Sequence, residues 1–229
     1  MKAITAAAHR VGATCGFDLA HAAGHIKLEL HDWNVDFATW CSYKYLNSGP
    51  GGVSGIYVHE KHCDNTELPR FAGWWGHDKE TRFLMEKGFQ PMKSAEAWQM
   101  SNAPVLTMAA PTASVDIFDE VGMDKLLKKQ RLLSGYLEFI VDDINEKHLN
   151  KEEGKWLNNI TPRNWHERGC QVSIIAEGFG RPLFDVLLNE GIITDWREPN
   201  VIRMAPVPLY NSFEDIYKFG ETLIKAIQA

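Results

Sequence analysis

The sequence predicts an α/β protein, in which part of a large domain with a mostly parallel sheet is followed by a small α+β domain. Short apolar segments alternate with helical patterns up to about residue 60. A long helical stretch follows Pro104, and strand-like and helical segments then alternate again. Hydrophobic residues make up 45% and charged residues 24% of the chain, a balance typical of a protein with a packed core.

The first part of the chain carries the parallel-sheet pattern. Residues 1–10 are rich in alanine and predict a short helix. Strands are expected in three apolar segments rich in aromatic and β-branched residues, namely 13–19, 35–42 and 53–58. An amphipathic helix is expected at 26–33, and the Gly- and Pro-rich segment 47–52 predicts a tight loop.

The second part of the chain is expected to begin at residue 120, so the predicted domains are 1–119 and 120–229. Residues 105–146 predict helix with one or two breaks, because Leu133, Leu137, Ile140 and Ile144 share one helical face. A polar loop is expected at 145–156. Strands follow at 171–175, 192–194 and 201–204, with a helix at 181–190 closed by Gly191. Ser212 and Asp215 predict a capping box at the start of a last helix.

Composition excludes several classes of protein. Lys and Arg number 24 against 30 Asp and Glu, and this acidic balance disfavours a nucleic-acid-binding surface. No apolar segment is long enough to span a bilayer, and the first residues do not read as a secretory signal. The four cysteines form no C-x-x-C pair, which favours a reducing cytoplasm, and no metal ion is expected. His21 and His25 are four residues apart, but zinc is disfavoured there.

The strongest chemical signal is Lys44, which follows a predicted strand and precedes the glycine-rich loop. Desolvation beside apolar and aromatic groups lowers the pKa of a lysine, and only the neutral amine attacks a carbonyl to form an imine. The alternative is a surface lysine whose aliphatic stem packs on Tyr43 or Tyr45.

Asp18 ends the preceding predicted strand. Open α/β sheets bind ligands at the carboxyl ends of their strands, so Asp18 and Lys44 are expected to converge on one crevice. Pyridoxal phosphate enzymes use such a pair, with the lysine in a Schiff base and the carboxylate on the pyridine nitrogen. His21 lies three residues further on and could brace that carboxylate. Asp18 could equally be a helix N-cap.

Seven segments follow one another in the order of a known family: FDLAHA (17–22), LHDW (30–33), CSYKYLN (41–47), GWWGH (73–77), SNAP (101–104), RGCQ (168–171) and IRMAPVPLYNSF (202–213). Through them the chain resembles kynureninase, a fold-type I, class V aminotransferase-like enzyme. The resemblance covers nearly the whole chain and matches the C-terminal part of the family.

The resemblance implies a hydrolase that acts on a carbon–carbon bond. Kynureninases convert L-kynurenine to anthranilate and L-alanine, or 3-hydroxykynurenine to 3-hydroxyanthranilate, in tryptophan catabolism by the kynurenine pathway and in NAD biosynthesis. It also implies pyridoxal 5'-phosphate as cofactor, a cytoplasmic homodimer with cofactor sites at the interface, and no nucleic-acid or membrane partner. Residues 1–119 would be the C-terminal half of the cofactor-binding large domain.

The resemblance assigns cofactor contacts to five residues besides Lys44. Asp18 would pair with the pyridine nitrogen, and His21 would lie next to the ring. Tyr43 would contact the phosphate and donate a proton during bond cleavage, which requires nearby positive charge to lower its pKa. Trp74 and Asn102 would reach the phosphate of the other subunit. Without the resemblance, Trp74 would be read as a core or interface anchor and Asn102 as a turn residue.

Three further residues are assigned to the substrate by the resemblance. Arg203 would bind the α-carboxylate through its planar guanidinium, although a surface arginine on a strand is the alternative. His77 and Trp75 would line the aromatic pocket.

The chain departs from the family in length, which is roughly twice as great in the family. The phosphate-cradling loop and half of the sheet have no counterpart here, so the strands are expected to have open edges. Two alternatives therefore stand beside a kynureninase. One is a catalytically incompetent fragment or pseudoenzyme that acts as a binding module through its exposed half-sheet. The other is a different fold-type I enzyme such as a cysteine desulfurase, although those carry His before the lysine, where this chain has Tyr43.

Overall fold

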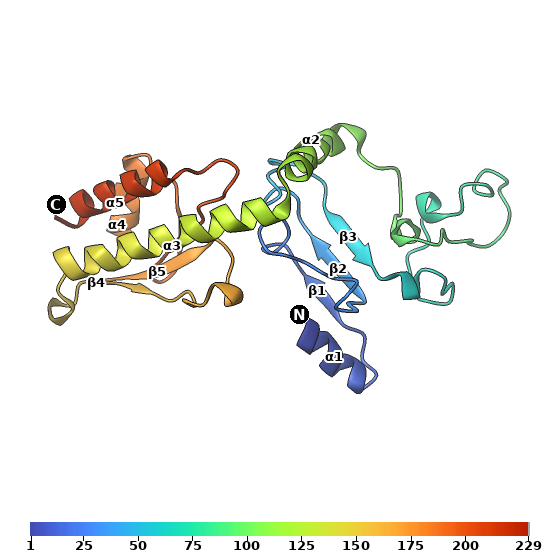
Figure 1. Cartoon of the computed structure of the whole chain (residues 1–229). Coiled ribbons are helices and arrows are strands. Elements are labelled where there is room, and N and C mark those ends of the chain that lie inside the picture. The colour runs from blue at the N-terminus through green and yellow to red at the C-terminus, as the bar shows by residue number, and fades with distance from the viewer. Residues whose placement is uncertain (229) are drawn as a thin grey trace. The chain divides into compact units, whose positions relative to one another are not determined.

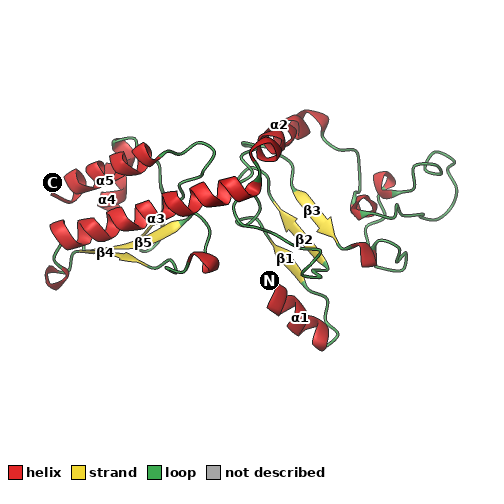
Figure 2. Ribbon diagram, viewed as in Figure 1, coloured by secondary structure: helices red, strands yellow, loops and turns green. Residues whose placement is uncertain are grey.

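The computed structural model describes residues 1–228, which form two compact units. The first unit is Met1–Glu120 and the second begins at Val121. Figure 1 shows the elements of each unit and Figure 2 their secondary structure. Each unit is described by itself below.

The first unit is built on a three-stranded sheet in the order β1-β2-β3. Helix α1 (Lys2–Arg10) precedes β1 (Gly16–Asp18), which is followed by β2 (Phe37–Trp40) and β3 (Gly55–Val58). Strands β1 and β2 are parallel, whereas β2 and β3 are antiparallel. The three strands and α1 were predicted, but the strands are shorter than expected and the sheet is mixed.

The helix predicted at 26–33 is wrong. This segment forms turns, of which one is closed by Trp33 N–H donating to Glu29 O at 2.9 Å. Asn34 then adopts φ 56°, a left-handed conformation that ends the turn and leads into β2. The predicted helix was only eight residues long, and the cost of helix nucleation is hard to recover over so short a stretch.

Residues 59–104 run largely without regular structure. They contain three short 3₁₀ helices, η1 (Glu60–His62), η2 (Trp74–Gly76) and η3 (Ala95–Trp98). Helix α2 (Val105–Val121) follows and contains Pro111.

The second unit packs helices on a four-stranded antiparallel sheet in the order β4-β5-β7-β6. Its helices are α3 (Met123–His148), α4 (Arg181–Asn189) and α5 (Phe213–Gln228). Its strands are β4 (Trp156–Asn159), β5 (Val172–Glu177), β6 (Asp195–Arg197) and β7 (Val201–Met204). Two 3₁₀ turns, η4 (Lys151–Glu153) and η5 (Trp165–Glu167), flank β4. The core is aliphatic, with Leu133, Leu157, Ile174, Leu187, Ile202 and Leu223 almost fully buried.

Two predictions for the second unit are wrong. The polar segment 145–156 is not a loop throughout, because α3 continues to His148 and β4 begins at Trp156. Residues 192–194 are not a strand, because Ile192 N–H donates back to Leu187 O of α4 at 2.9 Å, and pairing with β7 starts only at Asp195.

The predicted helix ends are confirmed. Gly191 has φ 82° just after α4, and the break between α2 and α3 falls at Gly122, with φ 82°. Asp215 N–H donates to Ser212 Oγ at 3.2 Å while Ser212 N–H donates to Asp215 Oδ2 at 2.7 Å, so the capping box forms. None of the helices in residues 1–228 combines the length and apolar character needed to cross a bilayer.

Candidate active site

The carboxyl ends of β1 and β2 form the edge of the sheet that carries Asp18 and Lys44. Asp18 is the last residue of β1 and pairs in register with Thr39 of β2, while Lys44 follows the end of β2 by four residues. Leu19 N–H donates to Thr39 O at 2.7 Å, which holds the two chain segments together just past Asp18. The parallel pairing therefore brings the acid and the lysine to the same edge of the sheet.

Lys44 lies in a turn that is closed by two buried serines. Ser48 Oγ donates to Ser42 Oγ at 2.7 Å, and Ser42 Oγ donates to Val53 O at 2.6 Å. Gly52 is needed beside them, because a Cβ there would lie 2.0 Å from Ser48 Oγ. The half-buried Lys44 side chain has no hydrogen bond or ion pair within residues 1–228, and its Nζ lies 5.9 Å from the Tyr43 ring centroid. The backbone of the lysine is thus fixed while its amine is not paired with a carboxylate.

Asp18 is exposed, and one of its oxygens is used locally. Ala20 N–H donates to Asp18 Oδ1 at 2.8 Å in a local turn, and no helix follows, so Asp18 is not the helix N-cap that was the alternative. Oδ2 has no hydrogen bond or ion pair within residues 1–228, so the second oxygen is available to a ligand. His21 is also exposed and meets Tyr45 edge-on, with ring centroids 6.1 Å apart.

Sequence reasoning missed the support that His25 and Gly24 give to the lysine turn. The ring of buried His25 packs on buried Tyr45, with centroids 3.8 Å apart. Burial, and to a smaller degree the charge of His21, lowers the pKa of His25 from 6.5 to about 4. A Cβ on Gly24 would lie 2.6 Å from the backbone carbonyl of Tyr45, so the turn after β1 and the residue after Lys44 are in direct contact.

Tyr43 is exposed at the start of the lysine turn. Cys41, through a side-chain hydrogen bond and its charge, raises the pKa of the Tyr43 phenol above its ordinary value of 10. The proton-donor role needs a lowered pKa, and the assignment of Tyr43 to that role stays a prediction.

Trp74, Trp75 and His77 lie in and after η2, where buried Arg82 organises the backbone. Arg82 donates to Trp75 O at 3.0 Å and to His77 O at 2.8 Å, and its guanidinium carbon lies 4.6 Å from the Trp75 ring centroid. His77 Nε2 contacts Thr81 Oγ1 at 3.1 Å. Trp74 and His77 share a cavity of about 250 Å³ with Thr81 and Arg82.

Asn102 is exposed just before α2. Its segment approaches η2 closely, since a Cβ on Gly73 would lie 2.0 Å from Met100 Cα. Trp74 and Asn102, the two residues predicted to bind phosphate, thus belong to chain segments that are in contact at Gly73 and Met100.

Arg203 lies on β7 in the second unit. Its neighbours Ile202 and Met204 are buried in the core, so its side chain projects from the opposite face of the sheet with 24% of it exposed. Arg203 Nε donates to Asp195 Oδ2 at 2.5 Å. This partner was not predicted from the sequence.

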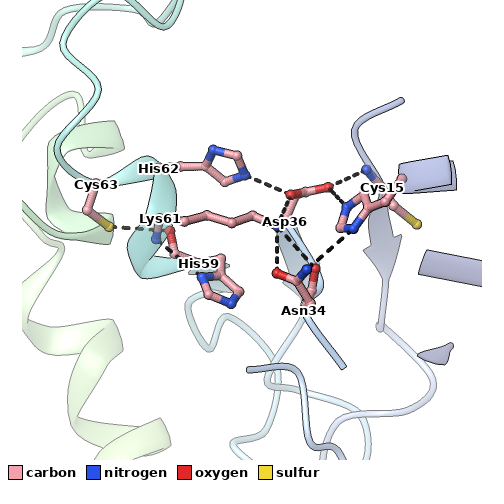
Figure 3. Close-up of polar contacts among 8 residues, drawn as sticks. Cys15, Asn34, Asp36, His59, Lys61, His62 and Cys63 are labelled. Carbon is pink, nitrogen blue, oxygen red and sulfur yellow. Dashed lines mark hydrogen bonds and ion pairs between the residues drawn. The ribbon is translucent and has the colours of Figure 1, made fainter. Parts of the chain in front are cut away.

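A buried carboxylate, Asp36, ties the elements of the first unit together (Figure 3). Asp36 Oδ1 lies 2.7 Å from both Lys61 Nζ and His62 Nε2, and Asp36 Oδ2 lies 2.7 Å from His9 Nε2 and 2.6 Å from Cys15 N. Burial alone would raise the pKa of Asp36, but the Lys61 ammonium, the Cys15 N–H and the two histidines outweigh it and hold the pKa well below its ordinary range. The only signal in the sequence was a lone acid in an apolar segment.

One face of the first sheet exposes large apolar side chains. Phe37 is 47% and Ile56 46% exposed. These two residues line a cavity of about 470 Å³ together with Leu68, Pro69 and Trp98. Neither Asp18 nor Lys44 contributes to it, so this apolar cavity is separate from the carboxyl edge of the strands.

Two protein-family models match the chain. Residues 1–171 match aminotransferase class-V, and residues 128–223 match the kynureninase C-terminal domain. A kynureninase from Flavobacterium psychrophilum is 59% identical over 227 residues, which are 99% of this chain and 52% of that protein. A kynureninase from Mus musculus is 48% identical over 229 residues, 100% of this chain and 49% of that protein. The chain therefore spans about half the length of the curated relatives it matches.

Solved structures with the same fold are more distant in sequence. A cysteine desulfurase from Thermococcus onnurineus NA1 superposes with a TM-score of 0.74 at 18% identity, covering 99% of this chain and 56% of that chain. A cysteine desulfurase from Escherichia coli superposes with a TM-score of 0.76 at 15% identity, covering 99% and 55%. These matches confirm the predicted fold class, a partial fold-type I large domain followed by a small α+β domain.

Proposed function

Because the chain belongs to the class-V aminotransferase family and corresponds to the C-terminal part of kynureninases, we propose that it supplies half of a pyridoxal phosphate-dependent kynureninase. The proposed reaction is hydrolysis of a carbon–carbon bond in L-kynurenine or 3-hydroxykynurenine, with release of L-alanine. The observation that carries the proposal is 59% identity to a kynureninase over 99% of the chain.

The carboxyl edge of the first sheet fits the cofactor on two observations. The Lys44 amine has no ion pair within residues 1–228, and exposed Asp18 uses only Oδ1 in a local hydrogen bond. An unpaired amine can form a covalent bond to an aldehyde carbon, and a carboxylate can keep a pyridine nitrogen protonated. We assign Lys44 and Asp18 to these tasks and place His21 beside the ring.

When bound, pyridoxal phosphate withdraws electron density from the α-carbon of the substrate. Lys44 would remove and return protons at this carbon, for which its amine must be neutral. Arg203 would bind the α-carboxylate through two parallel N–H donors and so fix the orientation of the substrate.

Tyr43 is the proposed proton donor when the carbon–carbon bond breaks. Its pKa is raised within this chain by Cys41. A proton-donating phenol needs nearby positive charge, and the proposal requires that the assembled site supplies it.

The remaining assignments concern the assembled protein. Trp74 and Asn102 would donate N–H groups to the cofactor phosphate of the other subunit in a homodimer, and His77 and Trp75 would line the aromatic pocket. The contact between the segments of Trp74 and Asn102, through Gly73 and Met100, supports a common target.

The proposed setting is tryptophan catabolism and NAD biosynthesis in the cytoplasm. Among the described residues, none of the four cysteines forms a disulfide bond, which is in keeping with a reducing compartment.

A non-catalytic binding role is the second candidate, because Phe37 and Ile56 expose an apolar sheet face over a cavity of about 470 Å³. The cysteine desulfurase alternative has weaker support, since that likeness is one of fold alone at 18% identity or less.

The test is complementation by the missing half. The chain would be mixed with the first half of the Flavobacterium psychrophilum relative, supplied with pyridoxal phosphate, reduced with borohydride and mapped by peptide mass spectrometry. We expect the label on Lys44, together with release of anthranilate from kynurenine, and loss of both in Lys44→Arg but not in Lys27→Arg. A label on another lysine overturns the assignment of Lys44. A complex that forms without label or turnover favours the binding role.

A further inference from the structure

Asp195 and Arg203 are directly opposite each other on neighbouring strands. Strands β6 and β7 are antiparallel, with Asp195 in register with Arg203. Arg203 Nε donates to Asp195 Oδ2 at 2.5 Å, and Arg203 Nη2 pairs with the same oxygen. The carboxylate therefore occupies the Nε–Nη2 side of the planar guanidinium.

The contacts of Arg203 leave the other edge of its guanidinium available. Both of its polar contacts within residues 1–228 go to Asp195, through Nε and Nη2. Five N–H donors in a rigid fork allow a second carboxylate to bind end-on, through Nη1 and Nη2. The side-on pairing with Asp195 is thus compatible with end-on binding of a substrate carboxylate.

The position of β7 restricts the rest of the Arg203 side chain. Arg203 also pairs in register with Ser173 of β5, so its strand is held on both sides. Because Ile202 and Met204 are buried in the core, the backbone of Arg203 is fixed. Its guanidinium is the part whose position depends on Asp195. A long flexible side chain gains precision when one edge of its head group is fixed in advance.

The charge balance of the group also favours an anionic ligand. Arg197 Nε lies 3.0 Å from Asp195 Oδ2, so one carboxylate faces two guanidinium groups. Two positive charges and one negative charge leave a net charge of about +1. A bound carboxylate would neutralise the group.

We propose that Asp195 is a positioning residue, which holds Arg203 so that its outer edge meets the substrate α-carboxylate. The inference rests on the proposed function, since it deepens the role assigned there to Arg203. Asp195 itself does not touch the substrate. Its removal is expected to weaken carboxylate binding and to leave the chemistry at the α-carbon unchanged.

The first experiment uses the chain itself and needs no turnover. Phenylglyoxal modification of Arg203 would be followed by peptide mass spectrometry in the wild type, Asp195→Asn and Asp185→Asn. Asp185 is the matched control, because it pairs with exposed Arg181 of the same helix at 3.6 Å. We expect Arg203 to react several-fold faster in Asp195→Asn only. An unchanged rate in Asp195→Asn overturns the proposal.

The second experiment measures binding in the complemented enzyme. A 3-aroylpropanoate inhibitor carries a charged carboxylate, whereas its methyl ester is neutral and one methyl group larger. We expect Asp195→Asn to weaken binding of the acid about tenfold and to leave binding of the ester unchanged. The KM for the substrate should rise about tenfold, while kcat stays within about twofold of the wild type. Asp195→Glu should restore part of the lost affinity for the acid. Equal weakening of acid and ester indicates a merely structural role and overturns the inference. If Arg203→Ala weakens the acid and Asp195→Asn does not, the inference alone fails. If Arg203→Ala has no effect, the substrate role of Arg203 in the proposed function fails as well.

Discussion

The carboxylate of Asp36 lies 2.7 Å from the ammonium of Lys61, and the Asp36 side chain is only 4% exposed. Lys61 belongs to η1 after β3, whereas Asp36 directly precedes β2. The same carboxylate receives the His9 ring of α1 and the Cys15 N–H before β1. One buried acid therefore connects the helix and all three strand segments of the unit that presents Lys44.

Asp36→Asn is expected to lower the free energy of unfolding of the first unit by about 2 kcal/mol, since a neutral amide replaces the buried carboxylate that binds Lys61, His62, His9 and the Cys15 N–H. Hydrogen–deuterium exchange of peptides covering residues 2–18, with increasing urea, would measure this loss. Exchange in the second unit should not change. Asp32→Asn is the matched control, because Asp32 is exposed and its one polar side-chain contact within residues 1–228 is with His31 at 3.4 Å. Equal protection in Asp36→Asn and the wild type would contradict the prediction.

The pH dependence of this effect follows from the lowered pKa of Asp36. In the unfolded chain an aspartate titrates near ~3.9, so the folded state binds the proton more weakly. The contribution of Asp36 is thus fully present above about pH 4 and is lost as the pH falls through the folded pKa. The difference between wild type and Asp36→Asn should persist at neutral pH and shrink below about pH 4.

Gly24→Ala is expected to disturb the lysine turn. Gly24 has φ 93°, and a Cβ would lie 2.6 Å from the Tyr45 carbonyl, so the turn would have to separate from the residue next to Lys44. We expect the free energy of unfolding of the first unit to fall by about 2 kcal/mol or more, and borohydride-trapped labelling of Lys44 to become slower. Gly12→Ala is the control, since Gly12 has φ 75° but open space around it. Gly12→Ala introduces only the backbone strain of an alanine at positive φ, about 1 kcal/mol, without a steric clash. Equal effects of the two variants would rule out the contact with Tyr45 as the cause.

Local signals in the sequence were sufficient for part of the fold. Strand β7 and the start of α5 were predicted because an apolar strand pattern and the Ser212–Asp215 capping box are complete within a few residues. The helix expected at 26–33 was wrong because its amphipathic pattern is overridden by the turn that Asn34 ends. Strand β4 was missed because its hydrogen-bond partners, β5 and the side chain of Asn145 on α3, lie 12 or more residues away.

The same distinction applies to the site. Asp18 and Lys44 could be brought to one edge of the sheet because both follow predicted strands and parallel strands end on one side. The partners of Asp36 lie 21 to 27 residues away, in segments whose register no single strand reveals. Asp195 was missed because the predicted strand ended at residue 194, one residue before the pairing with β7 begins.

Asn145→Ala is expected to release β4 from α3. Buried Asn145 donates from Nδ2 to Leu157 O at 2.8 Å, and its Oδ1 accepts from Leu157 N–H at 2.9 Å. Losing both bonds leaves the buried N–H and C=O groups of Leu157 without hydrogen-bond partners. The unfolding free energy of the second unit should fall by about 2–4 kcal/mol. Urea unfolding followed by exchange at residues 156–159 would measure it. Asn150→Ala is the control, because Asn150 caps the exposed η4. A loss as small as that of the control would show that water replaces both bonds.

His25→Gln is expected to remove an acid-sensitive step in the stability of the first unit. The pKa of His25 is lowered from 6.5 to about 4 by burial and by His21. Between these values the unfolded chain binds a proton at His25 and the folded chain does not. The free energy of unfolding therefore falls as the pH drops, by about 3 kcal/mol at most. At pH 7 both states are neutral at this position and the effect vanishes.

The measurement compares the unfolding free energy of the first unit at pH 7.0 and 4.5 in the wild type and His25→Gln. The wild type should lose stability over this interval, and His25→Gln should lose less. Exposed His148→Gln in α3 is the control and should keep the wild-type slope in the first unit. This window lies above the one in which Asp36 acts, so the two groups can be separated by pH alone. A His25 ring that titrates near 6.5 by NMR would contradict the burial argument, because an imidazole that is protonated so readily cannot be packed dry against Tyr45.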